Sequence, residues 1–307
     1  MGERVAAIDC GTNSVRLLVG ERSGAGFLEL DRQIRLTRLG QGVDATGEFH
    51  PDALARTLDA VAEYAGLLAD LGVGRRRFVA TSAARDAHNR DEFFSGVLAA
   101  MGVEAEIISG DEEARLSFTG AVAALPDAEA PVLVMDIGGG STELVLGDPK
   151  RPGAAVGTSL DIGAVRMRER FLASDPPTPA QVAEATAHID ALLAGCGIDL
   201  GAASTWIGVG GTATSLSAIA QQLPVYDRTR VHGSTLPLPE LDALTRRLLT
   251  MEVADVLRFP TMVPARADVI CAGGLICQRV GASTQLDLTV SESDILDGIV
   301  ADLLASP

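Results

Sequence analysis

Lysine is nearly missing from this 307-residue sequence: of its 25 basic residues, Lys150 is the only lysine and the other 24 are arginines. A GC-rich genome would produce the same bias. Its chemical consequence is that any bound anion must be held by arginine, whose planar fork suits phosphate oxygens. The 41 acidic residues bring the net charge at pH 7 to −16. This negative charge excludes a general electrostatic attraction to nucleic acid or to anionic lipid.

Long hydrophobic runs and paired cysteines are missing as well. No stretch approaches the ~18 uninterrupted apolar residues of a membrane helix. The N-terminus, "MGERVAAIDCG", carries charge before it enters an expected strand, which is unlike a signal peptide. The cysteines lack the spacing of metal ligands and are expected to be reduced thiols: Cys10, Cys196, Cys271 and Cys277. We therefore expect a cytoplasmic protein that binds neither nucleic acid nor membranes.

The sequence does contain a repeated unit. "VAAIDCGTNSVRLLVG" (5–20) and "VLVMDIGGGSTELVLG" (132–147), aligned on Asp9 and Asp136, share Gly, Ser, Leu and Gly at the second, fifth, eighth and eleventh following positions. Each pattern predicts a β-hairpin whose turn exposes backbone N–H groups. Two such hairpins indicate a duplicated domain with two phosphate-facing turns. The candidate phosphate-binding residues in these turns are Gly11, Thr12, Asn13, Ser14, Gly138, Gly139, Gly140, Ser141 and Thr142.

Alternating strands and helices predict an α/β protein. Strands are expected at 77–82 and 103–109, and helices at 90–102, 179–195, 239–251 and 266–280. The segment "ALPDAEAP" (124–131) is typical of a linker, and the last helix is expected to return to the first domain. The predicted domains are therefore residues 1–125 with about 291–307, and residues 126–290.

Acidic side chains at the repeated strands suggest a metal. Asp9 and Asp136 each end an apolar strand, and carboxylates that face phosphate need a cation such as Mg²⁺ between them. The alternative is that both residues only satisfy turn N–H groups. Seven positions after these aspartates the repeats differ, with Arg16 adding a cation beside the first turn and Glu143 a carboxylate beside the second.

Three further segments carry candidates. "GVGGTAT" (208–214) predicts an anion site at a helix N-terminus formed by Gly210, Gly211 and Thr212. In "TSAARD" (81–86), Arg85 is either a phosphate clamp or a surface arginine. In "SGDEEAR" (109–115) the acids have an explanation without chemistry, since an N-cap at Asp111 and glutamates in the first turn favour the helix dipole.

Together these motifs resemble the Ppx/GppA phosphatase family. The resemblance runs along the chain through "DCGTNSVRLL", "TSAARDAHN", "IISGDEEARLSFTGA", "DIGGGSTELVLG", "GVGGTAT", "VHGSTL" and "RADVICAGGLI". It implies two ribonuclease-H-like domains of the actin/Hsp70/sugar-kinase superfold flanking a cleft. Members of the family use Mg²⁺ to hydrolyse the terminal phosphoanhydride of inorganic polyphosphate, or to convert pppGpp to ppGpp.

The resemblance also implies roles for individual residues. Glu113 matches the catalytic glutamate that orients and deprotonates the attacking water, which overrides the purely structural explanation of that acid. Asp136 and Glu143 match positions implicated in metal and water placement, so with Asp9 from the strand pattern the metal set is Asp9, Asp136 and Glu143. The phosphate-contacting basic positions become Arg16, Arg85, Arg166 and Arg266. A homodimer is the expectation taken from the family.

Two departures from the family pattern bear on the substrate. Family members often carry Gly-Leu-Arg-Glu-Gly where this sequence has "DILDG" (294–298), so Asp297 replaces a cation and is expected to repel distant phosphates. Longer relatives continue into a helical domain implicated in gripping long polymers. Both departures predict an exopolyphosphatase that prefers short chains. The alternatives are a pppGpp 5′-phosphohydrolase, a kinase of the same superfold, and a non-catalytic polyphosphate or nucleotide sensor.

Overall fold

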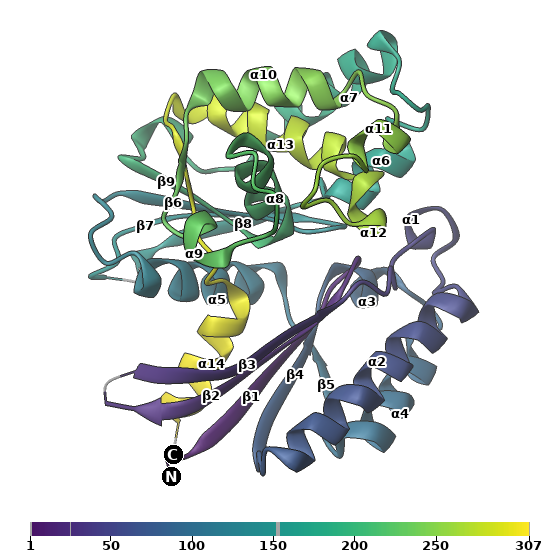
Figure 1. Ribbon diagram of the computed structural model, residues 1–307, viewed down its shortest axis with the longest axis vertical. Helices are drawn as coiled ribbons and strands as arrows, with labels where there is room; N and C mark the ends of the chain where they lie inside the picture. The colour runs from purple at the N-terminus through teal and green to yellow at the C-terminus, as the bar shows by residue number, and fades with distance from the viewer. Residues whose placement is uncertain (1, 25, 152–153, 307) are drawn as a thin grey trace. The chain divides into compact units, whose positions relative to one another are not determined.

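The computed structural model describes residues 2–24, 26–151 and 154–306. The chain divides into two compact units, which we call unit 1 (Met1–Gly120 with Ile295–Pro307) and unit 2 (Ala121–Asp294). The predicted domain limits, after residue 125 and before about residue 291, remain our proposal. Figure 1 shows the helices and strands of both units.

Unit 1 is built on a five-stranded mixed sheet with the order β3-β2-β1-β4-β5. Its strands are β1 (Arg4–Cys10), β2 (Val15–Ser23), β3 (Gly26–Arg35), β4 (Arg75–Ala80) and β5 (Ala105–Ile107). The first three strands form an antiparallel meander, whereas β4 and β5 run parallel to β1. The central strand β1 is apolar over most of its length, as expected of a strand that is covered on both faces.

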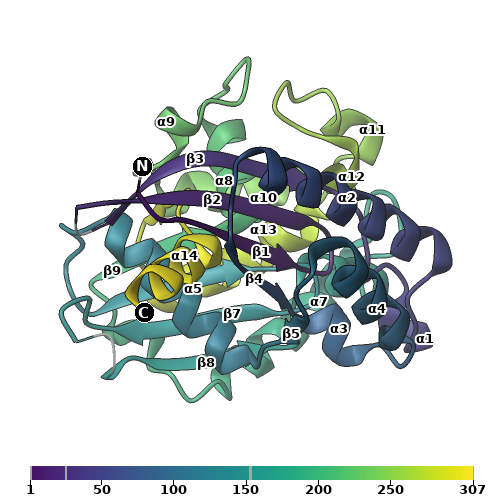
Figure 2. The same cartoon turned by 90° about the horizontal axis from the view of Figure 1, so that it is seen from below.

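Helices cover both faces of this sheet. The helices of unit 1 are α1 (Val43–Thr46), α2 (Pro51–Asp70), α3 (Ser82–Asp86), α4 (Arg90–Met101), α14 (Ile295–Ala305) and most of α5 (Gly110–Ala124). One face packs against α2 and α4 around Tyr64, Phe78 and Phe93, and the other packs against α14 through Leu18 and Ile299 (Figure 2). The final helix therefore completes the core of unit 1.

Unit 2 repeats this arrangement. Its six strands follow the order β10-β11-β9-β6-β7-β8. They are β6 (Val132–Ile137), β7 (Thr142–Gly147), β8 (Val156–Leu160), β9 (Thr205–Val209), β10 (Thr235–Leu236) and β11 (Leu288–Val290). As in unit 1, the first three form an antiparallel meander, and β9 runs parallel to the first strand of that meander.

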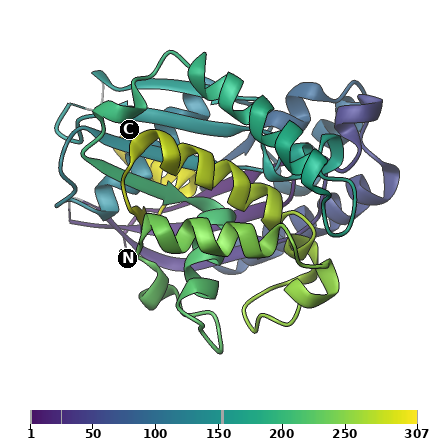
Figure 3. The ribbon, with the colours of Figure 1, turned by 90° about the horizontal axis from the view of Figure 1, so that it is seen from above.

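The helices of unit 2 form a layer on its sheet. They are α6 (Ala164–Arg170), α7 (Pro179–Ala194), α8 (Gly210–Ala220), α9 (Arg228–Val231), α10 (Leu238–Leu248), α11 (Val253–Val256), α12 (Pro264–Ala267) and α13 (Ile270–Thr284). Helix α13 contacts both α7 and α10, and Figure 3 shows the three helices side by side. Trp206 is fully buried in the core that they share with the sheet.

The predicted fold class is confirmed, because each unit places a three-stranded meander next to parallel strands in the ribonuclease-H-like order. The sequence analysis missed the third strand of each meander, β3 and β8. Both are only partly buried and alternate irregularly, so the period-two pattern of a strand is weak in them. The strand expected at 103–109 is confined to β5, and the helix expected at 266–280 is split between α12 and α13. Within the described residues, no helix combines the length and apolar character needed to cross a bilayer.

Candidate active site

The predicted site residues of unit 1 gather at one edge of its sheet. Because β1, β4 and β5 run parallel, their carboxyl ends meet at the same edge. The turn 11–14 follows β1, helix α3 with Arg85 follows β4, and helix α5 with Glu113 follows β5. Ligands of open α/β sheets bind at this edge.

The glycine turn of unit 1 is fixed by neighbours that the sequence analysis did not identify. The Gly11 N–H donates to the Ser14 carbonyl at 2.9 Å, and the hydroxyls of Thr12 and Ser82 lie 3.0 Å apart. Gly40 donates its N–H to the Thr12 carbonyl, and a Cβ at Gly40 would lie 2.3 Å from Thr12 Cγ2. Only glycine fits at position 40. Ser82 and Gly40 thus both contact Thr12 and hold the turn in place.

Asp9 and Arg16 lie opposite each other on β1 and β2 and form an ion pair. The Oδ2 atom of Asp9 accepts from Arg16 Nε at 2.9 Å and from Nη2 at 2.5 Å. Asp9 is 3% exposed. The residue predicted as a metal ligand and the residue predicted to contact phosphate thus neutralise each other here.

Glu113 is buried and contacts Arg85, whose Nη1 lies 3.2 Å from Glu113 Oε2. The same nitrogen donates to the Ile108 carbonyl at 2.8 Å. Glu112 instead pairs with Arg77 at 2.7 Å. The N-cap suggested at Asp111 is wrong, because Ser109 Oγ accepts from the Glu112 N–H as a capping side chain does. The neighbouring acids Glu112 and Glu113 thus pair with different arginines.

In unit 2 the corresponding hairpin brings two acids together. Asp136 and Glu143 lie directly opposite each other on β6 and β7, and they are 8% and 2% exposed. Glu143 Oε1 accepts from Ser159 Oγ on β8 at 2.7 Å. Like charges directly opposite across strands are destabilising unless a cation lies close by. Oxygen ligands of this kind favour a hard cation such as Mg²⁺.

Gly210 allows α8 to begin close to Asp136. Its φ of +76° is in the left-handed region, and a Cβ added there would lie 2.7 Å from Asp136 Oδ1. A second close approach follows at Gly211, where a Cβ would lie 2.5 Å from Arg266 Nη2. Arg266 Nη1 donates to Ser215 Oγ at 2.9 Å. The Arg266 guanidinium therefore lies beside the N-terminus of the 11-residue helix α8. Both groups favour a bound anion.

The remaining predicted residues of unit 2 support these turns. Arg166 is buried and donates Nε to the Gly140 carbonyl at 2.8 Å, so it helps to fix the glycine turn. Thr142 Oγ1 donates to the Ile162 carbonyl. Thr212 packs against α13, since a Cβ at Gly273 would lie 2.7 Å from Thr212 Oγ1.

Comparison with known proteins agrees with this arrangement. Residues 18–306 match the model of the Ppx/GppA phosphatase family. The chain belongs to this family. It is 46% identical to exopolyphosphatase 2 of Mycobacterium tuberculosis over 98% of both chains.

Two crystal structures of Ppx/GppA-like proteins have the same fold. One is described as an exopolyphosphatase-like protein, with 39% identity and a TM-score of 0.94 over 99% of both chains. The other is the Ppx/GppA family member of Aquifex aeolicus, with 31% identity and a TM-score of 0.83, covering 99% of this chain and 98% of that one.

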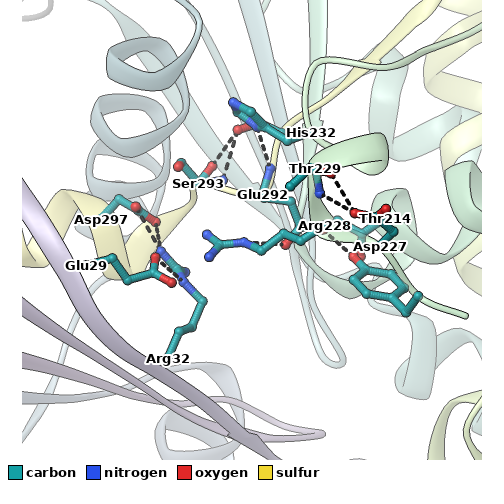
Figure 4. A network of polar contacts seen from close by, with 12 residues as sticks. Glu29, Arg32, Thr214, Asp227, Arg228, Thr229, His232, Glu292, Ser293 and Asp297 are labelled. Carbon is teal, nitrogen blue, oxygen red and sulfur yellow. Dashed lines mark hydrogen bonds and ion pairs between the residues drawn. The ribbon is translucent and has the colours of Figure 1, made fainter.

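In this Ppx/GppA chain the charge of Asp297 is compensated. Arg32 Nη2 donates to Asp297 Oδ1 and Oδ2 at 2.9 and 3.0 Å, and its Nε donates to Glu29 Oε2 at 3.0 Å (Figure 4). The sequence analysis treated Asp297 as a bare negative charge, and the ion pair corrects that assumption. The repulsion expected from Asp297 is reduced accordingly.

Glu292, which follows β11, is a polar centre that the sequence analysis missed. It accepts from the Tyr226 hydroxyl and from Arg228 Nε, and its N–H donates to His232 Nδ1 at 3.2 Å (Figure 4). Burial and the neighbouring Glu292 charge raise the pKa of Tyr226, whereas the Arg266 charge lowers it by a smaller amount. The cluster connects the segment 226–232, which includes α9, to Glu292 just after β11.

Among the residues that the structure describes, no group of three or more His, Cys, Asp or Glu side chains is arranged to hold a metal. A cation at Asp136 and Glu143 would thus take its other ligands from water or from substrate. Mg²⁺ characteristically binds in this way, through one or two carboxylates and phosphate oxygens.

Proposed function

We propose that this Ppx/GppA phosphatase is an exopolyphosphatase that removes the terminal phosphate of inorganic polyphosphate and prefers short chains. The observation that carries the proposal is the contact of Glu113 with Arg85 at the carboxyl edge of the sheet. A carboxylate beside a cation that can anchor phosphate is what water attack on phosphorus requires. The whole-chain similarity to exopolyphosphatase 2 of M. tuberculosis supports the same activity.

Glu113 acts on water in this reaction. Its carboxylate accepts a proton from a water molecule whose oxygen bonds to the terminal phosphorus. The bond from that phosphorus to the bridging oxygen breaks, and the shortened chain leaves with the bridging oxygen. The products are orthophosphate and a polyphosphate one unit shorter. Arg85 and the N–H groups of residues 12–14 hold the phosphate oxygens, so positioning and electrostatics provide most of the rate.

Asp136 and Glu143 fit a bound Mg²⁺, because they are two buried acids on directly opposite strand positions. When bound, the ion neutralises the negative charge of the phosphate oxygens. Asp9 fits less well, since the charge of its carboxylate is already neutralised by the paired Arg16. The glycine turn 138–140, the start of α8 and Arg266 are assigned to substrate phosphates. A homodimer and a cytoplasmic location remain proposals.

Phosphate release in Mg²⁺ from tripolyphosphate, long polyphosphate, pppGpp and ATP, compared at equal concentrations of chain ends, tests this function. We expect tripolyphosphate to react fastest and pppGpp more slowly. Exclusive cleavage of pppGpp would make the protein a pppGpp 5′-phosphohydrolase. Transfer to an added acceptor without hydrolysis would make it a kinase, and binding without turnover would make it a sensor.

A further inference from the structure

Arg85 is held at two points of unit 1 while part of its side chain stays accessible. It lies in α3, and its backbone N–H donates to the Thr81 carbonyl at 3.2 Å. Its side chain retains 26% exposure. The backbone of Arg85 is thus fixed relative to β4, and the guanidinium extends toward the start of α5.

The guanidinium uses only one of its three nitrogens for these contacts. Nη1 donates to the Ile108 carbonyl at 2.8 Å and to Glu113 Oε2 at 3.2 Å. Within the described part of the chain, Nε and Nη2 have no hydrogen-bond partner. These two nitrogens form the edge with which arginine binds phosphate oxygens in a bidentate manner.

We propose that Arg85 is a positioning residue for Glu113 in addition to a phosphate ligand, an inference that rests on the proposed function. Nη1 holds the Glu113 carboxylate while the Nε–Nη2 edge takes a substrate phosphate. Because the guanidinium is rigid and planar, a single side chain sets the position of the base relative to the phosphorus that the water attacks.

The surroundings of Glu113 make this contact specific. The adjacent acid, Glu112, is directed to Arg77 at 2.7 Å and does not compete for Arg85. The Ile108 carbonyl, just after β5, keeps Nη1 at the first turn of α5. Lysine at position 85 would retain the charge but has a single nitrogen and no planar fork, so it cannot hold both groups in this geometry.

The test is a double-mutant cycle between Arg85→Lys and Glu113→Gln. It measures kcat and KM for tripolyphosphate in saturating Mg²⁺, and Kd for a tripolyphosphate analogue with imido bridges. In the wild-type background we expect Arg85→Lys to lower kcat by roughly 10²-fold, the effect of a small misplacement of reacting groups. In the Glu113→Gln background the same change should alter kcat less than about twofold. Arg85→Lys should weaken analogue binding equally in both backgrounds.

Arg77→Lys is the matched control, because it makes the same change beside the neighbouring glutamate of the same helical turn. Its kcat should stay within about twofold of wild type, and circular dichroism should show all variants folded. The inference is overturned if Arg85→Lys lowers kcat equally in both backgrounds, or if Arg77→Lys lowers it as strongly as Arg85→Lys. If Glu113→Gln retains wild-type activity, the proposed base fails and the inference fails with it. If Glu113→Gln is strongly impaired but measurable, additive losses in kcat would overturn the inference while leaving the proposed base intact.

Discussion

Asp136 faces Glu143 across β6 and β7, whereas the equivalent positions of unit 1 hold the ion pair of Asp9 and Arg16. The duplicated hairpins have therefore diverged in charge at one cross-strand position. In unit 1 the pair is internally neutral, and in unit 2 it consists of two acids, which fits the proposed cation site. This difference assigns the metal to unit 2 in the proposed function.

Asp136→Asn should raise the Mg²⁺ concentration needed for half-maximal phosphate release by roughly tenfold or more, about 1.4 kcal/mol of binding free energy. The reason is that Mg²⁺ prefers a carboxylate to an amide oxygen. Asp9→Asn is the comparison and should shift the titration less, because Arg16 already binds Asp9. Identical Mg²⁺ titration curves for wild type and Asp136→Asn would remove Asp136 from the metal site.

Glu113→Gln should lower turnover by roughly 10²–10⁴-fold, which is the usual contribution of a positioned general base. Binding of the imido analogue should change little, because the substitution keeps the size of the side chain. Initial rates at saturating Mg²⁺ and tripolyphosphate check this. A variant that kept more than about a third of the wild-type rate would rule out Glu113 as the base.

Arg16→Ala should lower the free energy of unfolding, because it leaves the buried Asp9 carboxylate without this partner. Breaking a buried pair costs up to about 3–5 kcal/mol, and the 18% exposure of the Arg16 side chain reduces that figure. Adding Asp9→Asn to Arg16→Ala should restore part of the loss. Urea unfolding measures the free energy of unfolding of the single and the double variant. If Arg16→Ala and the double variant were equally stable, the unpaired Asp9 carboxylate would not be the cause of the loss.

Gly210→Ala should impair the metal site, since it adds a Cβ 2.7 Å from Asp136 Oδ1 at a φ of +76°. The matched control is Gly197→Ala, which has a φ of +77° and no atom within 4 Å of the added Cβ. Both changes carry the backbone penalty of about 1–2 kcal/mol for a left-handed residue. Only Gly210→Ala should also raise the Mg²⁺ requirement. Equal Mg²⁺ titrations for the two variants would contradict a role for this close approach.

The two tyrosines, Tyr64 and Tyr226, should resist ionisation in the folded protein. Burial is the main cause that raises the pKa of both, and the Glu292 charge adds to it for Tyr226. A raised pKa of an acid favours the neutral form in the folded state. The resulting stability is present below the unfolded pKa of about 10 and is lost as pH rises through the folded values.

Absorbance of phenolate measured against pH tests this, together with circular dichroism on the same samples. The phenolate of the fully buried Tyr64 should appear only as the protein unfolds at alkaline pH. Tyr226 retains 40% exposure although its hydroxyl contacts Glu292, and it should therefore ionise before the fully buried Tyr64. Reversible titration of both tyrosines near pH 10 with native dichroism would contradict the prediction.

The local sequence pattern was sufficient to predict the two hairpins and their glycine turns and to recognise the family. In a hairpin the spacing along the chain determines which residues lie opposite each other, so the separation of seven positions already pairs Asp136 with Glu143. The same spacing pairs Asp9 with Arg16, and the sequence analysis assigned these two residues separate roles only because it did not count across the turn.

Tertiary structure alone decided the contacts between distant segments. Arg32 meets Asp297 across 265 positions of the chain, and Arg85 meets Glu113 across 28. Neither contact follows from spacing, because each depends on how parallel strands bring their carboxyl ends together and on where α14 packs. The partly buried strands β3 and β8 belong to the same class, since their position comes from pairing with β2 and β7 rather than from a strong pattern of their own. Local periodicity encodes which element forms, whereas the charge that each side chain meets is set by packing between elements far apart in sequence.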